Sequence, residues 1–102
     1  IHGEAVSIGI CLAFKFSNKL SFCSISDTER VINIFKKLKL PTSLKEISDL
    51  SITTLKMVEK FKYDKKTVNN KLTFILNYQI GKSFIKYDVN VNDLIKFIDE
   101  EI

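Results

Sequence analysis

The chain has 102 residues but only one histidine, His2, and only one arginine, Arg30. A zinc site needs at least three protein ligands, so this single histidine does not make a complete metal centre by itself. Arginine is the usual residue for bidentate contacts to phosphates and bases. The net charge of +4 comes from dispersed lysines instead. We therefore expect no nucleic-acid partner.

Cysteine and glycine are also scarce, with two and three residues. Cys11 and Cys23 fit neither a zinc knuckle nor a disulfide framework, so we expect both to be reduced and Cys11 to pack as a small apolar side chain. No glycine-rich loop follows a strand, which excludes the usual dinucleotide site. The longest apolar run, residues 5–14, is too short to cross a bilayer. We expect a cytoplasmic protein without a membrane role.

The composition, 45% hydrophobic and 27% charged, is typical of a single globular domain. Residues 4–16 are apolar on nearly every side, which predicts a helix buried on several faces, with Gly9 permitting a close approach. Ser26 and Glu29 have capping-box spacing for a second helix that ends before Pro41. The apolar positions expected to face inward in this helix are Val31, Ile34, Phe35 and Leu38.

The second half of the chain changes its pattern. A short helical turn is predicted over residues 43–46, and Ser51 is expected to cap a helix whose inward positions are Leu55, Val58 and Phe61. Residues 71–89 alternate as two strands around Gly81, and Asn90 or Asn92 is expected to cap a final helix. The predicted fold class is mainly α, with a small β-hairpin near residues 71–89.

His2 and Glu4 open the first predicted helix. Considered alone, a single histidine is most simply a surface or hydrogen-bonded residue, and Glu4 is a carboxylate that favours the positive end of the helix dipole. A metal role for His2 therefore requires support from outside these residues.

That support comes from a resemblance. The sequence HGEAVSIG at residues 2–9 resembles the His-Gly-Glu-x-Val-x-x-Gly signature of 3-dehydroquinate synthases. LPTSL at 40–44, DKK at 64–66 and KLTFILNYQIGKSFI at 71–85 follow in the order found in that family. The resemblance implies that residues 1–102 are part of a helical C-terminal domain, and that an NAD-binding N-terminal domain is absent from this chain.

The resemblance also implies roles for particular residues. His2 corresponds to one ligand of a divalent metal, zinc or cobalt, whose other ligands lie upstream of this chain, and Glu4 is a conceivable partner of the imidazole. Lys65 or Lys66 corresponds to a lysine that contacts the acidic groups of a sugar-phosphate substrate. The resemblance does not decide between these two lysines. No residue of this chain is expected to bind NAD.

The activity implied for the intact protein is a phosphate-eliminating lyase of the shikimate pathway. It converts 3-deoxy-D-arabino-heptulosonate 7-phosphate to 3-dehydroquinate with NAD as cofactor, whereas the chain alone is expected to be inactive. The alternatives are a related cyclase, such as a 2-deoxy-scyllo-inosose or 2-epi-5-epi-valiolone synthase, and a non-catalytic helical interaction module. In this chain alone we expect apolar residues such as Ile8, Ile10 or Phe14 to be left exposed or to be buried by self-association, and we therefore expect a homodimer formed over them.

Overall fold

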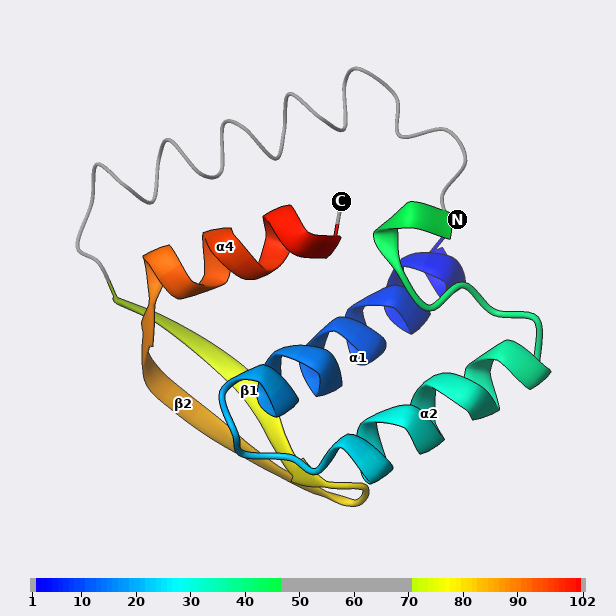
Figure 1. The fold of residues 1–102 in the computed structure, drawn as a ribbon, viewed down its shortest axis with the longest axis horizontal. Coiled ribbons are helices and arrows are strands. Elements are labelled where there is room, and N and C mark those ends of the chain that lie inside the picture. Colours follow the sequence, from blue (N-terminus) through cyan, green and yellow to red (C-terminus); the bar gives the residue numbers. More distant parts are fainter. Residues whose placement is uncertain (1, 47–70, 102) are drawn as a thin grey trace.

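The computed structural model describes residues 2–46 and 71–101. In Figure 1, α1 crosses the centre of the molecule, with α2 on one side of it and the hairpin and α4 on the other. The described elements confirm a mainly helical fold with a small hairpin. They are α1 (His2–Lys19), α2 (Ile25–Lys37), the 3-10 turn η1 (Leu44–Glu46), β1 (Lys71–Gln79), β2 (Lys82–Asn90) and α4 (Val91–Glu101).

A tight turn joins α1 to α2. Ser21 adopts a left-handed φ of 69° just after the end of α1, and the Phe22 N–H donates to the Ser17 carbonyl at 2.8 Å. Ser24 is the N-cap of α2, because its hydroxyl accepts from the Asp27 N–H at 3.1 Å. The predicted capping box starting at Ser26 is therefore wrong, since Ser26 already lies inside the helix.

The end of α2 is closed by a second left-handed residue, Lys39, with a φ of 59°. The following N–H, that of Leu40, donates back to the Phe35 carbonyl at 2.9 Å. The predicted turn over 43–46 is confirmed as η1. Two of the apolar positions expected to face inward are instead exposed, because Ile34 and Leu38 retain 46% and 64% of their accessible surface.

The hairpin is antiparallel, and its turn contains Gly81 with a φ of 82°. Positive φ is unstrained for glycine, which explains why the chain reverses here. On one face of the hairpin Leu76 and Val89 are buried, whereas the cross-strand pair Ile75 and Ile85 on the other face is exposed. This alternation is that of a hairpin covered on one side.

Asn90 leads directly from β2 into α4. Its side-chain oxygen accepts from the Asn92 N–H at 2.8 Å and from the Asp93 N–H at 3.2 Å. Asn90 is therefore the cap, and Asn92 lies in the first turn of the helix. The cap turns the chain so that the apolar side of α4 packs beside α1.

Two apolar clusters form the described core. One joins α1, the hairpin and α4 through Phe16, Leu76, Val89, Leu94 and Phe97. The other joins α1 to α2 through Cys11, Phe14, Cys23 and Val31. The expectation that Ile8 and Phe14 are exposed is wrong, since they retain 3% and 7% of their surface. Ile10 is exposed at 40%, so α1 is buried on part of its circumference only.

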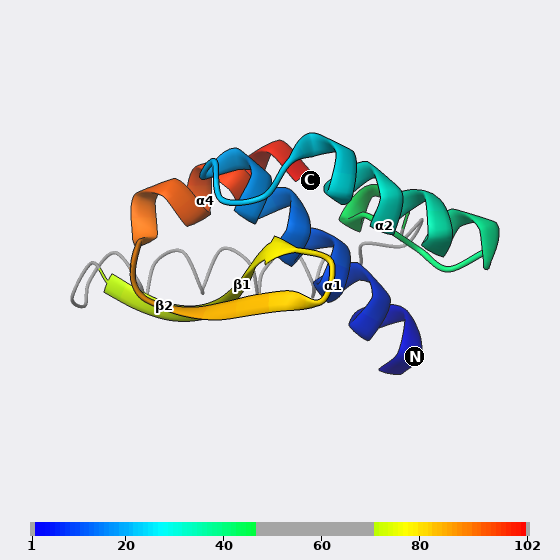
Figure 2. The same ribbon diagram turned by 90° about the horizontal axis from the view of Figure 1, so that it is seen from below.

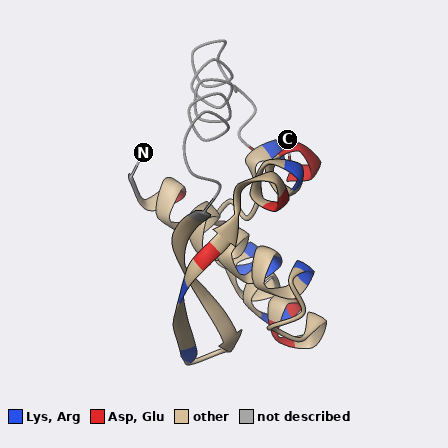
Figure 3. Ribbon diagram, turned by 90° about the vertical axis from the view of Figure 1, so that its left-hand side faces the viewer, with Lys and Arg blue, Asp and Glu red and all other residues tan. Residues whose placement is uncertain are grey.

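Several predictions fall outside the described residues, namely the cap at Ser51 and the inward positions Leu55, Val58 and Phe61. In the part of the chain that is described, no helix has both the length and the hydropathy needed to cross a membrane. Figure 3 shows basic and acidic residues interspersed on the helices.

Candidate functional site

His2 is the first residue of α1, and its side chain lies outside the described part of the structure. Figure 2 shows that this end of α1 projects beyond the hairpin and the other helices. The next residues, Gly3 to Val6, are exposed. The first residues of the motif that resembles the metal-binding signature, up to Val6, thus lie on an exposed helix end.

The first buried residue along α1 is Ser7, which retains 3% of its surface. Its hydroxyl donates to the backbone carbonyl of Pro41 and also lies 3.3 Å from the Glu4 carbonyl. The contact with Pro41 joins residues that are 34 positions apart in the sequence. The beginning of α1 is therefore held against the connection between α2 and η1.

Lys15 makes a second link to the same connection from further along α1. Its ammonium lies 3.1 Å from the Thr42 carbonyl and 3.0 Å from a carboxylate oxygen of Glu101 in α4. Thr42 is held in turn by Glu46, whose carboxylate accepts from the Thr42 N–H at 2.7 Å and from its hydroxyl at 3.2 Å. These contacts connect α1, η1 and α4 on one side of the molecule.

Cys11 lies between Ser7 and Lys15 on α1 and is completely buried. Burial raises the pKa of its thiol, an effect that nearby Lys15 opposes and Glu46 reinforces. A thiol with a raised pKa is a poor nucleophile, because the thiolate is the reactive form. Cys11 is free, as is Cys23, so the expectation that Cys11 packs as a small apolar residue is confirmed.

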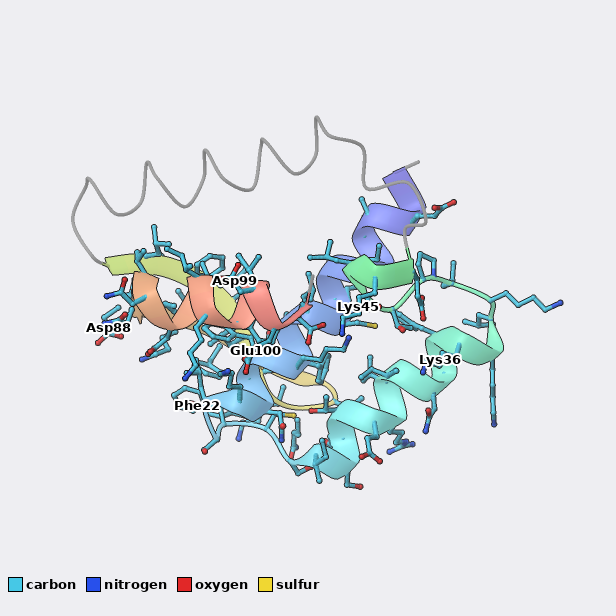
Figure 4. All side chains as sticks on the ribbon, turned by 45° about the horizontal axis from the view of Figure 1, so that its top comes forward. Phe22, Lys36, Lys45, Asp88, Asp99 and Glu100 are labelled. Carbon is cyan, nitrogen blue, oxygen red and sulfur yellow. The ribbon has the colours of Figure 1, made fainter. Side chains whose placement is uncertain are left out.

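The surface beside α1 is hollowed in more than one place. A hollow of about 420 Å³ near the start of the helix is lined by the charged residues Glu4, Lys36, Lys39 and Glu46, together with Leu40 and Pro41. A groove of about 310 Å³ on the other side is apolar and is lined by residues of α1, β1 and α4. Figure 4 places Lys36 and Lys45 at the end of the molecule where α1 begins, and Asp88 at the opposite end.

The structure describes only some of the site residues that were predicted from the sequence. His2 is located by its backbone, whereas Lys65 and Lys66 lie outside the described residues. The links made by Ser7 and Lys15 were not predicted. A local signal existed, since Ser7, Cys11 and Lys15 follow one another at four-residue spacing and therefore share a helix face.

The described residues contain no complete set of ligands for a divalent metal. Among residues 2–46 and 71–101, no three His, Cys, Asp or Glu side chains are placed to hold a metal ion. One imidazole at a helix end fits a single ligand position, and a zinc site requires at least two more. The described residues therefore do not complete a metal site by themselves.

Known proteins similar to this chain identify its family. Residues 1–67 match the family model described as 3-dehydroquinate synthase C-terminal. The 3-dehydroquinate synthase of Rhizobium johnstonii is 38% identical over 101 residues, which is 99% of this chain and 27% of that protein. Those of Sinorhizobium medicae and Brucella ovis are each 37% identical over 102 residues, again 27% of their length. The chain thus spans about a quarter of these relatives, and it belongs to the family of the 3-dehydroquinate synthase C-terminal domain.

Proposed function

We propose that this chain is the C-terminal part of a 3-dehydroquinate synthase that supplies one metal ligand, His2, to an active site shared with an N-terminal NAD-binding domain. The intact enzyme converts 3-deoxy-D-arabino-heptulosonate 7-phosphate to 3-dehydroquinate and phosphate in the shikimate pathway. The observation that carries the proposal is the position of the motif at residues 2–9, on an exposed helix end that continues into the core.

In this proposal His2 binds the metal as a neutral imidazole. A divalent metal held there makes a bound alcohol easier to deprotonate and polarises a carbonyl oxygen. The second ring nitrogen of a metal-binding histidine needs a hydrogen-bond acceptor. Glu4 does not suit this role, because residues two positions apart in an α-helix point to different sides of it. Metal binding by a neutral imidazole should weaken as pH falls and the ring becomes protonated.

The substrate carries a carboxylate and a phosphate, so it needs cationic partners. Lys65 or Lys66 is proposed to contact one of these groups, because a lysine ammonium is a mobile point charge that suits either anion. Replacing each lysine separately with methionine should raise the KM for the sugar phosphate at one position and change little at the other. That asymmetry identifies which lysine contacts the substrate.

The proposal treats this chain as incomplete for catalysis. Residues 1–102 alone should release no phosphate from the heptulosonate phosphate, whereas the complete protein should release it in a reaction that requires catalytic NAD and a divalent metal. Turnover of a different sugar phosphate only would favour a related cyclase. Phosphate release by the complete protein without either NAD or a divalent metal would contradict the proposal.

A non-catalytic helical module is the alternative from a different functional class. It predicts that the complete protein lacks the remaining metal ligands and binds no zinc. The discriminating experiment is therefore phosphate release by the complete protein and by its His2→Ala variant, with Lys45→Ala as a matched surface control. If all three proteins release phosphate at the same measurable rate, His2 has no role in the mechanism.

A further inference from the structure

Among the residues that the structure describes, few contacts hold the start of α1 in place. The first N–H groups of a helix have no intrahelical partners, and helix ends fray readily. Residues 3–6 are exposed, so their side chains give little restraint. Ser7 and Ile8 are the first buried residues of the helix, with 3% of the surface of each remaining exposed.

The hydroxyl of Ser7 has a choice of acceptors. It lies 3.3 Å from the Glu4 carbonyl, a local contact within the same helix that could satisfy it without any tertiary partner. It also donates to the Pro41 carbonyl, from a distant part of the chain. The second contact is therefore not required to satisfy the serine, and its effect is to fix the helix against the 40–46 connection.

The acceptor side of this bond is held from both directions. Upstream, the Leu40 N–H donates to the Phe35 carbonyl at the end of α2. Downstream, Glu46 holds both the N–H and the hydroxyl of Thr42. Proline fixes its own φ, which removes one of the backbone rotations that set the direction of the carbonyl that Ser7 contacts. Pro41 is thus a restrained acceptor for the helix.

His2 precedes Ser7 by five residues, which is about 7.5 Å along the axis of a helix. We infer that Ser7 is a positioning residue for His2, acting through its hydrogen bond to the Pro41 carbonyl. This inference rests on the proposed role of His2 as a metal ligand. Restraining this helix end before the metal arrives lowers the ordering cost of binding, so the bond should strengthen metal affinity without touching the metal.

The chain offers a matched control in Ser17. Ser17 is also buried in α1, and its hydroxyl accepts from the Asn77 N–H of β1 at 2.9 Å. Ser17→Ala therefore removes a comparable tertiary hydrogen bond from the opposite end of the same helix. It should lower stability as Ser7→Ala does, while leaving the first turns of α1 in place.

The experiment uses the complete metal-loaded protein and its metal-free form. Zinc affinity is measured by competition with a fluorescent chelator, and hydrogen exchange is followed at the amides of residues 6–8 in the metal-free form. Ser7→Ala should weaken zinc binding by about threefold to tenfold, less than the loss of a direct partner of a metal ligand. It should also speed exchange of those amides by about fivefold, the expected effect of one lost hydrogen bond.

Ser17→Ala should change neither quantity by more than about twofold, since its bond lies at the far end of α1. Glu46→Ala, which loosens the acceptor side, should change both in the same direction as Ser7→Ala and keeps the test available should Ser7→Ala fold poorly. Equal effects of the two serine variants, or no effect of both Ser7→Ala and Glu46→Ala, would overturn the inference.

His2→Ala separates this inference from the function on which it rests. If His2→Ala keeps full zinc affinity, the proposed function fails, and the positioning role fails with it whatever the exchange data show. If His2→Ala loses zinc while Ser7→Ala matches the wild type in both readouts, the positioning role alone is wrong.

Discussion

The ammonium of Lys15 lies 3.0 Å from the Glu101 carboxylate and joins α1 to the last turn of α4. Both side chains are four-fifths buried, with 20% of each exposed. The same ammonium reaches the Thr42 carbonyl, so one lysine connects three segments that are distant in the sequence.

Replacing Lys15 with methionine should therefore destabilise the protein. Methionine keeps the apolar stem but leaves the Glu101 carboxylate and the Thr42 carbonyl without their donor, which should lower the free energy of unfolding by about 2 kcal/mol. Urea unfolding of the chain measures this. Lys19→Met is the control, because its ion pair with Glu100 is exposed, and it should change stability little. If both variants lose a similar unfolding free energy, the buried ion pair of Lys15 contributes no more to stability than the exposed pair of Lys19.

The N-cap of α2 gives a sharper comparison. Ser24→Ala removes the acceptor for the Asp27 N–H and should cost about 1 kcal/mol of unfolding free energy. Ser26→Ala, two residues later inside the helix, should be neutral or slightly stabilising, since alanine has the higher helix propensity. Thermal unfolding of the two variants decides the position of the cap, and a larger loss at Ser26 would restore the capping box predicted from the sequence.

Two glycines should respond in opposite directions to alanine. Gly81→Ala forces a side chain into a φ of 82° and should cost about 1 kcal/mol or more, although a Cβ there would meet no described atom within 4 Å. Gly9→Ala lies inside α1, with nothing described within 4 Å of its Cβ, and should stabilise the chain by about 0.5–1 kcal/mol. If Gly9→Ala lowers the stability of the complete protein but not that of residues 1–102, another element of the complete protein packs against Gly9.

Cys11 predicts a dependence on alkaline pH. Because burial raises the pKa of its thiol, folding favours the protonated form, and this stabilising contribution is complete below the ordinary thiol pKa of 9.0. It is lost as pH rises through the raised value, so the urea midpoint should fall above about pH 9. In Cys11→Ala this part of the fall should be absent. Rapid alkylation of Cys11 in the folded protein near pH 8 would contradict its burial.

Local sequence patterns predicted the elements better than their contacts. The run at residues 4–16 and the alternation around Gly81 identify α1 and the hairpin because their periodicities are local properties. Ser24 and Ser26 each precede an acidic residue by three positions, so spacing alone did not select the cap.

The contacts of α1 depend on residues far away in the chain. An apolar run without polar breaks does not say which side is covered, which is why Ile8 and Phe14 were expected to be exposed but are buried. The hydrogen bond from Ser7 to Pro41 spans 34 positions and leaves no periodic signal. His2 was identified from its family resemblance, because a single histidine has no spacing to interpret.

The most direct test of the account is the zinc content of the complete protein and of its His2→Ala variant, each measured by elemental analysis after dialysis against excess metal-free buffer. The account predicts one tightly bound zinc per chain in the wild type, and loss of both zinc and phosphate release in His2→Ala. A His2→Ala protein that keeps its zinc and its full rate of phosphate release would contradict it.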